Sequence, residues 1–128
     1  MNHKEEGEQY LADNTKYDDI NVTESGLQYI IRKSGDGPQP GPDDRVEVNY
    51  HGTFINGKVF DSTYMGDPAI FGVSDVIDGW QEGLQLMNVG SVYKFYIPYQ
   101  LAYGEEGYDD VIPPYAMLIF EVELLDIT

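Results

Sequence analysis

The sequence contains no cysteine, and only two of its 128 residues are histidine. The absence of cysteine excludes disulfides, thiol catalysis and cysteine-ligated zinc or iron–sulfur sites. His3 and His51 are far apart and lack HExxH spacing, so a zinc site is not expected. A phosphate-binding glycine loop is missing as well. We therefore predict neither a metal nor a cofactor.

Basic residues are scarce, because 7 Lys and Arg stand against 23 Asp and Glu and leave a net charge of −16. Beyond residue 45 the only two basic residues are Lys58 and Lys94. A surface with this charge repels phosphate backbones and anionic lipid surfaces. Neither nucleic acid nor a membrane surface is an expected partner.

Long apolar segments are absent too. The longest strictly apolar run covers residues 116–120, whereas a membrane span needs about 20 residues. The first 20 residues contain no apolar stretch typical of a signal peptide. If the chain is complete, these observations favour the cytoplasm.

What the sequence does have is enough apolar material, 41% of the residues, for the core of one domain. Residues 1–25 form a polar leader in which a short helix around residues 4–14 is expected. That helix is too short to be stable alone. Ser25-Gly26 ends the leader, and we predict a folded domain over residues 26–128.

From residue 27 onward, apolar and polar residues mostly alternate, as in half-buried strands. This alternation predicts strands at residues 27–32, 46–51, 92–97 and 118–124, and the apolar residues within 70–73 suggest another. Asn56-Gly57 predicts a hairpin turn between residues 53–55 and 58–60. Residues 35–42 and 101–114 are expected to be loops.

One helix is expected in the domain. Its capping residue would be Ser74 or Asp75, and residues 88–90 would end it. Gly79 and Gly83 each cost about 1 kcal/mol of helix propensity, which is tolerable where another element packs closely. Its apolar stripe recurs at three- and four-residue spacing: Ile77, Trp80, Leu84 and Met87. The predicted class is α+β, with five or six antiparallel strands wrapped around one short helix.

Two weaker patterns favour structural interpretations. Residues 72–76 begin like a nucleophile elbow but lack its second glycine, so they are interpreted as the start of the helix. Glu105-Glu106 and Asp109-Asp110 suggest calcium, but EF-hand spacing is absent and a solvated acidic loop is favoured.

Aromatic and aliphatic residues also lie at element ends and in loops, where packing alone does not demand them. Taken one at a time, each of these residues could simply be part of the hydrophobic core, without a functional role. Together, motifs in one order along residues 27–125 resemble the FKBP-type peptidyl-prolyl isomerases: Val46-x-Val48-x-Tyr50-x-Gly52, Gly57-Lys58-x-Phe60-Asp61-Ser62, Val76-Ile77-x-Gly79-Trp80-x-Glu82-Gly83-Leu84, Ile97-Pro98, Ala102-Tyr103-Gly104, Ile112-Pro113-Pro114 and Leu118-x-Phe120-x-Val122-Glu123-Leu124.

The leader is similar to that of the bacterial Mip-like and FkpA-like branch, in Tyr10-Leu11-Ala12-x-Asn14 and Thr23-x-Ser25-Gly26-Leu27-Gln28-Tyr29. In that branch an upstream helical segment often dimerises, so the resemblance implies a dimer for a longer gene product. It also implies the bacterial periplasm or cell envelope rather than the cytoplasm.

The resemblance implies an apolar pocket between helix and sheet. In this pocket the enzyme would catalyse the cis–trans isomerisation of X–Pro bonds. Catalytic roles fall to Asp61, the one charge at the buried edge, to the Tyr103 hydroxyl and to the main-chain N–H of Ile77. The implied substrate-binding residues are Tyr50, Phe60, Phe71, Val76, Trp80, Tyr108, Ile112 and Phe120. Ala69 and Tyr108 depart from the usual family pattern at the pocket rim.

The implied partners are proline-containing polypeptides, with macrolides of the FK506 and rapamycin type as inhibitors. A chaperone-like module that holds proline-containing peptides without turning them over is the alternative. The presence of Asp61, Trp80, Tyr103 and Ile112 together favours the enzyme. A purely structural domain would leave the pocket aromatics unexplained.

Overall fold

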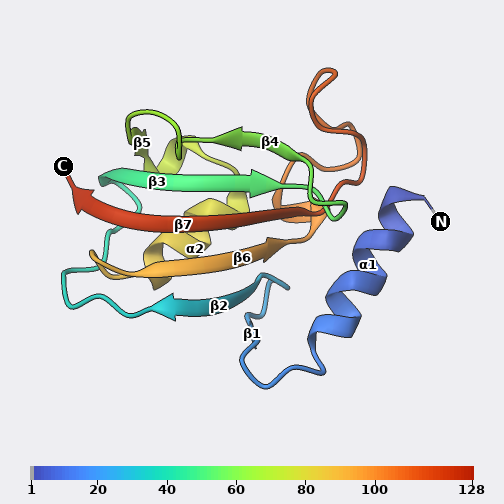
Figure 1. Cartoon of the computed structure of the whole chain (residues 1–128), viewed down its shortest axis with the longest axis horizontal. Coiled ribbons are helices and arrows are strands. Elements are labelled where there is room, and N and C mark those ends of the chain that lie inside the picture. The colour runs from blue at the N-terminus through green and yellow to red at the C-terminus, as the bar shows by residue number, and fades with distance from the viewer. Residues whose placement is uncertain (1) are drawn as a thin grey trace.

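A computed structural model describes residues 2–128 as one antiparallel sheet with one helix behind it and a second helix beside one end of it (Figure 1). The order of the sheet is β1-β2-β6-β7-β3-β4, and β5 also pairs with β3. The predicted class is confirmed, and the seventh strand is the two-residue β1 of the leader. The strands are β1 (Asn21–Val22), β2 (Gln28–Lys33), β3 (Arg45–Thr53), β4 (Val59–Ser62), β5 (Ala69–Gly72), β6 (Val92–Ile97) and β7 (Leu118–Ile127).

Alternation along the central strands gives the sheet two unlike faces. Val48 on β3 and Phe120 and Val122 on β7 are buried on the inner face, beneath helix α2 (Asp78–Leu86). Asn49 and Glu123, which pair across β3 and β7, lie on the outer face. The main hydrophobic core therefore fills the space between α2 and the inner face.

Helix α2 begins later than the sequence predicts. Its N-cap is Ile77, whose side chain makes no capping hydrogen bond. The prediction that Ser74 or Asp75 caps the helix is wrong, because residues Val73–Asp75 form a separate 3₁₀ turn, η1. Val73 belongs to that turn and not to the strand expected at residues 70–73. The extended backbone of Val76 separates the two helical segments.

The two glycines of α2 lie where the helix touches β6. This is the close packing of another element that makes glycine tolerable in the helix. A Cβ at Gly79 would come within 2.6 Å of Ile97 Cγ2, and one at Gly83 within 2.7 Å of Phe95 Cε1. Real Cβ atoms do not approach that closely, so both positions exclude any larger residue without movement of the core.

Gly83→Ala is expected to lower the free energy of unfolding by about 1–3 kcal/mol, because the new methyl group overpacks the buried Phe95 ring. The loss outweighs alanine's better helix propensity, about 1 kcal/mol. Urea unfolding measures the change. Gly66→Ala is the matched control, since a Cβ at residue 66 would meet nothing within 4 Å. Equal stability of Gly83→Ala and wild type would contradict the contact.

The leader helix α1 (His3–Asn14) packs on the outer face of the sheet. Tyr10 lies against Tyr96 of β6, with ring centroids 5.9 Å apart. The buried side chains of Asn14 and Gln28 also meet, since Asn14 Nδ2 donates to Gln28 Oε1 at 3.1 Å. Contacts with the sheet thus stabilise a helix too short to persist alone. The domain boundary expected near residue 26 stays a prediction.

Two connections lie at the end of the sheet that is near α1 (Figure 1). The hairpin predicted at Asn56-Gly57 joins β3 to β4, and the Phe54 N–H donates to the Lys58 carbonyl at 3.0 Å. The segment from residue 99 to 117 contains a 3₁₀ turn, η2 (Tyr99–Leu101), and a bridge between Tyr108 and Ile112. Within residues 2–128, no helix is both long and apolar enough to cross a membrane.

Candidate active site

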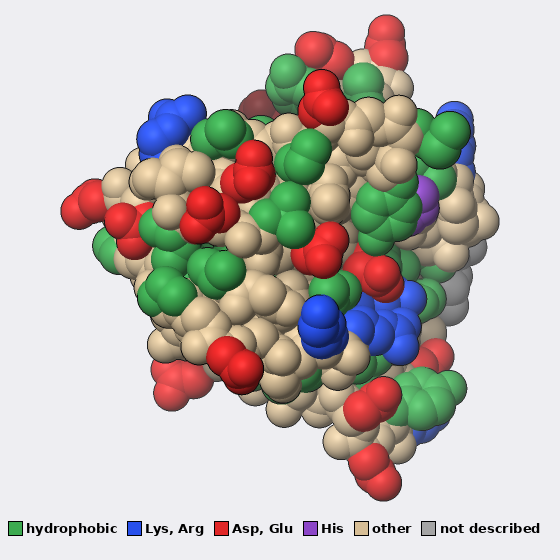
Figure 2. All heavy atoms as spheres, turned by 60° about the vertical axis from the view of Figure 1, so that its left-hand side comes forward, with side chains coloured by type: hydrophobic (Ala, Val, Ile, Leu, Met, Phe, Trp, Pro, Cys, Tyr) green, Lys and Arg blue, Asp and Glu red, His purple; other side chains and the backbone are tan. Residues whose placement is uncertain are grey.

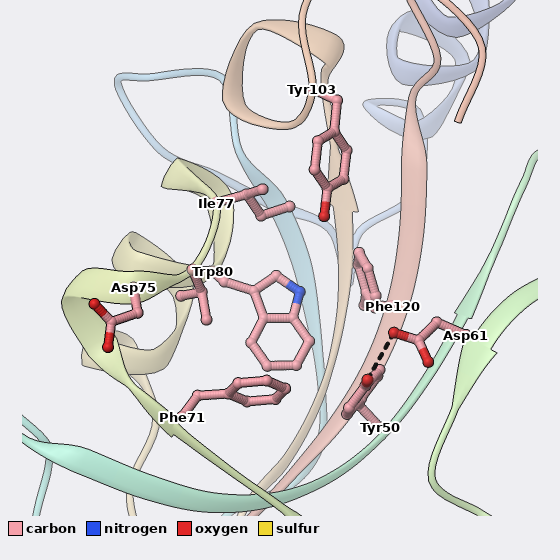
Figure 3. A pocket seen from close by; sticks show the side chains of 9 residues that line it. Tyr50, Asp61, Phe71, Asp75, Ile77, Trp80, Tyr103 and Phe120 are labelled. Carbon is pink, nitrogen blue, oxygen red and sulfur yellow. Dashed lines mark hydrogen bonds between the residues drawn. The ribbon is translucent and has the colours of Figure 1, made fainter. Parts of the chain in front are cut away.

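A cavity of about 450 Å³ opens between α2 and the inner face of the sheet (Figure 3). Strands β3, β4, β5 and β7, the start of α2 and the segment after η2 all contribute to it. Its lining is mostly aromatic and aliphatic, which suits an apolar ligand. The lining residues are Tyr50, Asp61, Phe71, Asp75, Val76, Ile77, Trp80, Tyr103 and Phe120.

The indole of Trp80 lies at the centre of the cavity (Figure 3). Trp80 lies in the first turn of α2, on the side that packs against the inner face of the sheet, and it is only 5% exposed. Three rings meet it edge to face at centroid distances of 5.1, 5.2 and 5.7 Å: Tyr50, Phe120 and Phe71. Edge-to-face contacts of this kind stabilise a ring by more than the burial of its apolar surface alone.

Tyr50 and Asp61 form the polar pair of the cavity. They come from the neighbouring strands β3 and β4, and the Tyr50 hydroxyl donates to Asp61 Oδ2 at 2.7 Å (Figure 3). Burial raises the pKa of Tyr50, and the hydrogen bond to Asp61 raises it further. The hydroxyl therefore stays protonated at neutral pH and holds the carboxylate in place.

Tyr103 extends from the segment after η2, and its hydroxyl points into the cavity (Figure 3). Its side chain is 36% exposed, so the ring lies at the mouth. Burial, followed by the hydroxyl of Tyr108 and the carboxylate of Asp61, raises the pKa of Tyr103. A protonated hydroxyl at this place is available to donate to a ligand.

The main-chain N–H of Ile77 is a second available donor. Ile77 precedes α2 in an extended conformation, and its carbonyl accepts the N–H groups of Trp80 and Gln81 at 3.0 Å. No acceptor within residues 2–128 takes the Ile77 N–H. An amide at the start of a helix lacks an intrahelical partner, so it can bind a ligand carbonyl.

Three predicted binding residues do not line the cavity. Phe60 packs edge to face behind Phe120 at 5.4 Å. Tyr108 is 54% exposed, and its ring is tilted against that of Tyr103 at a centroid distance of 5.4 Å. Ile112 is 2% exposed, because its paired hydrogen bonds with Tyr108 turn its side chain into the core. Direct ligand contact by these three stays a prediction.

The carboxylates differ from the expectation of one charge at a buried edge. Asp61 is exposed, because β4 is an edge strand of the sheet. Asp75, a predicted helix cap, also lines the cavity. Its place immediately before Val76 and Ile77 in the family-like motif was the available signal. Within residues 2–128, no group of three metal-ligating side chains is found.

Above pH 10 the free energy of unfolding is expected to fall. Burial raises the pKa of six tyrosines in the folded chain (Tyr10, Tyr50, Tyr64, Tyr93, Tyr96 and Tyr103), whereas an unfolded tyrosine titrates near pH 10. This stabilisation is complete below about pH 10 and is lost as pH rises through the folded values, because the unfolded chain releases its protons first. Urea unfolding at pH 8, 9.5 and 11 measures the trend. Tyr50→Phe should show a shallower decline, and a flat profile for wild type would contradict the argument.

Two known protein families match this chain. Residues 37–125 match the family described as FKBP-type peptidyl-prolyl cis-trans isomerase. Residues 1–31 match the domain amino terminal to FKBP-type peptidyl-prolyl isomerase. The chain belongs to the FKBP-type peptidyl-prolyl cis-trans isomerase family, and the resemblance seen in its motifs is confirmed.

Individual relatives are bacterial. The chain is 51% identical over 123 residues to the FKBP-type 22 kDa peptidyl-prolyl cis-trans isomerase of Escherichia coli, covering 95% of this chain and 60% of the relative. It is 49% identical to FkpA of Aeromonas hydrophila and 44% identical to Mip of Coxiella burnetii, covering 99% and 96% of this chain but 47% and 54% of those proteins. The chain thus spans about half the length of these curated relatives.

Solved structures agree with the fold. The crystal structure of Escherichia coli FkpA superposes with a TM-score of 0.95 at 40% identity, covering 98% of this chain and 59% of that one. A peptidyl-prolyl cis-trans isomerase from Pseudomonas syringae superposes with a TM-score of 0.92 at 32% identity, covering 98% and 93%.

Proposed function

We propose that this chain accelerates cis–trans exchange at X–Pro peptide bonds and binds the twisted amide without covalent chemistry. The observation that carries the proposal is the aromatic cavity around Trp80, into which the Tyr103 hydroxyl points and beside which the Ile77 N–H has no acceptor in the described chain. Proline-containing polypeptides are the proposed substrates. Membership of the family supports the reaction class.

The cavity suits this reaction because of how the barrier arises. Amide resonance opposes rotation by about 18–20 kcal/mol, and uncatalysed exchange takes tens to hundreds of seconds. In the twisted state resonance is lost and the carbonyl has less charge separation. An apolar cavity therefore disfavours the planar ground state relative to the twisted state. Lowering the barrier by about 4–6 kcal/mol gives roughly a thousand- to ten-thousand-fold acceleration.

Each lining group has a proposed part in this differential binding. Trp80 and Ile77 hold the proline ring, while Phe71 and Phe120 keep the Trp80 indole in position. The Tyr103 hydroxyl donates to a peptide carbonyl, and the Ile77 N–H binds a second carbonyl and fixes the backbone.

Asp61 orients the Tyr50 hydroxyl and sets the local field. Their hydrogen bond is already formed at 2.7 Å, so this part of the cavity needs no rearrangement when a peptide binds.

A protease-free isomerisation assay on a short X–Pro peptide tests the proposal directly. Exchange should accelerate without added metal or nucleotide and should persist in a chelator. Loss of activity on chelation, restored by one divalent ion, would count against it. Peptide binding without acceleration would instead favour a chaperone-like module that only holds proline-containing segments.

Macrolides of the FK506 and rapamycin type are expected to compete with the peptide, because they mimic a twisted prolyl amide. Binding should be weaker than in family members with an aromatic residue in place of Ala69 on β5. Calorimetric titration with and without peptide measures the competition. No binding alongside normal catalysis would mean that the cavity walls are wrongly assigned.

The longer protein is a separate proposal. Because the chain spans about half of its curated relatives, a helical segment outside it is proposed to mediate dimerisation. Sedimentation of the longer gene product, compared with this chain, tests that dimer.

A further inference from the structure

The two tyrosine hydroxyls of the cavity differ in how they are held. The Tyr50 hydroxyl donates to Asp61 at 2.7 Å, whereas no acceptor within residues 2–128 takes the Tyr103 hydroxyl. The Tyr103 ring is 36% exposed, and the ring of Tyr108 tilted against it is itself more than half exposed. The direction of the Tyr103 hydroxyl (Figure 3) therefore depends on how the backbone of this residue is held.

Hydrogen bonds hold the backbone on both sides of Tyr103. The Gly104 N–H donates to the Tyr99 carbonyl at 2.9 Å, and the Gly107 N–H donates to the Tyr103 carbonyl at 3.1 Å. In a third bond, the Tyr115 N–H donates to the Gly104 carbonyl at 3.0 Å. The first two bonds are local. The third closes the loop, since Tyr115 lies at its far end, shortly before β7.

Tyr115 adopts the left-handed backbone conformation, with a φ of 62°. This conformation is uncommon for residues that carry a Cβ and unfavourable for a bulky one. The Tyr115 ring packs edge to face on Tyr99, with ring centroids 5.0 Å apart. Tyr115 thus contacts the chain on both sides of Tyr103, through its ring and through its N–H. Strained backbone persists where the surrounding structure holds it, and it is concentrated at functional sites.

We propose that Tyr115 is a positioning residue, which holds Tyr99 and Gly104 so that the Tyr103 hydroxyl points into the cavity. The inference rests on the proposed isomerase function, in which this hydroxyl donates to a peptide carbonyl. Tyr115 is not among the residues that line the cavity, so it acts through Tyr103. Without its ring, residue 115 relaxes toward a commoner backbone conformation, and its N–H turns away from the Gly104 carbonyl.

A double-mutant cycle with Tyr103 provides the test. We would measure kcat/KM on a short X–Pro peptide for Tyr115→Ala and for the conservative Tyr115→Phe, each alone and combined with Tyr103→Phe. Tyr99→Ala removes the same ring contact from the other side and replaces Tyr115→Ala if that variant does not fold.

Tyr10→Ala is the matched control. Tyr10 is also a half-buried tyrosine whose ring lies against another tyrosine, Tyr96, but outside the cavity. Acidic side chains are scattered over the face shown in Figure 2, and the net charge of −16 affects how charged peptides approach. All of these substitutions are neutral, so this attraction is the same in every variant.

Tyr115→Ala is expected to lower kcat/KM by about three- to fivefold, close to the loss expected for Tyr103→Phe itself. In the Tyr103→Phe background it should cause little further loss, because no hydroxyl is left to position. Tyr115→Phe and Tyr10→Ala should keep the wild-type kcat/KM.

Three results would overturn the proposal: no loss in Tyr115→Ala, a loss of the same size in both backgrounds, or an equal loss in Tyr10→Ala. Losses that simply add are the signature of a purely structural role. If wild type binds the peptide without accelerating exchange, the isomerase function fails instead, and the same cycle in peptide Kd then tests Tyr115.

Discussion

Trp80→Ala is expected to lower the free energy of unfolding by about 3–5 kcal/mol, the usual cost of removing a buried aromatic side chain. The indole is 5% exposed and supports three rings edge to face, so its loss leaves a gap that the surrounding sheet cannot close. Denaturant unfolding followed by circular dichroism measures the change. Activity should fall too, because the proposed floor of the site disappears.

A second substitution at the same position keeps an aromatic ring but makes it smaller, and so serves as the comparison for Trp80→Ala. Trp80→Phe keeps a ring over the inner face of the sheet and should cost clearly less stability than Trp80→Ala. If both variants unfold at the wild-type denaturant concentration, Trp80 does not hold the cavity together, and the packing argument fails.

Asp61→Leu is expected to lower kcat/KM by about tenfold or more, while stability changes little. A tenfold loss corresponds to about 1.4 kcal/mol of transition-state stabilisation, to which the charge of Asp61 and its hydrogen bond to Tyr50 at 2.7 Å contribute. Because Asp61 is exposed, water can replace that hydrogen bond in the variant, so folding loses little. Tyr103→Phe removes a neutral donor and should cost about fivefold. Both side chains lie at the mouth rather than in the core, which is why turnover should suffer more than folding.

Tyr64→Phe is the matched control for these two variants. The Tyr64 hydroxyl also donates to a carboxylate, Glu121 Oε1 at 3.3 Å, but on the outer face of the sheet. Its removal should leave kcat/KM at the wild-type value. If melting temperature and activity decline in parallel for Asp61→Leu and Tyr103→Phe, the site assignment loses its support.

The sequence predicted the elements of this fold better than their ends. Period-2 alternation identified the central strands because one face of each lies in the main core. Where α1 covers the outer face, Tyr96 and Ile119 are buried as well. The apolar stripe of α2 was equally clear. The helix start was wrong because a capping side chain is only one way to begin a helix. Here Ile77 is the N-cap, with its backbone extended and no side-chain capping bond.

Distant contacts explain what the sequence could not reveal. The packing of α1 on the outer face depends on Tyr96 and Met117, which are far away along the chain. The burial of Ile112 has a different cause, a bridge to Tyr108 within the same loop, which the loop's composition does not indicate. Asp75 lines the cavity because it belongs to η1, a separate turn before α2.

The pairing of β3 with β7 determines when the cavity can exist during synthesis. Val46 pairs with Ile127 and Thr53 with Ile119, so the middle of the sheet joins segments far apart in the chain. Such non-local pairing closes slowly, on a scale of about milliseconds to seconds. Until β7 has left the ribosome, the inner surface of β3 and the apolar face of α2 have no complete partner. The final strand is therefore the last part of the chain that the hydrophobic core needs, and the core closes only after β7 has been synthesised.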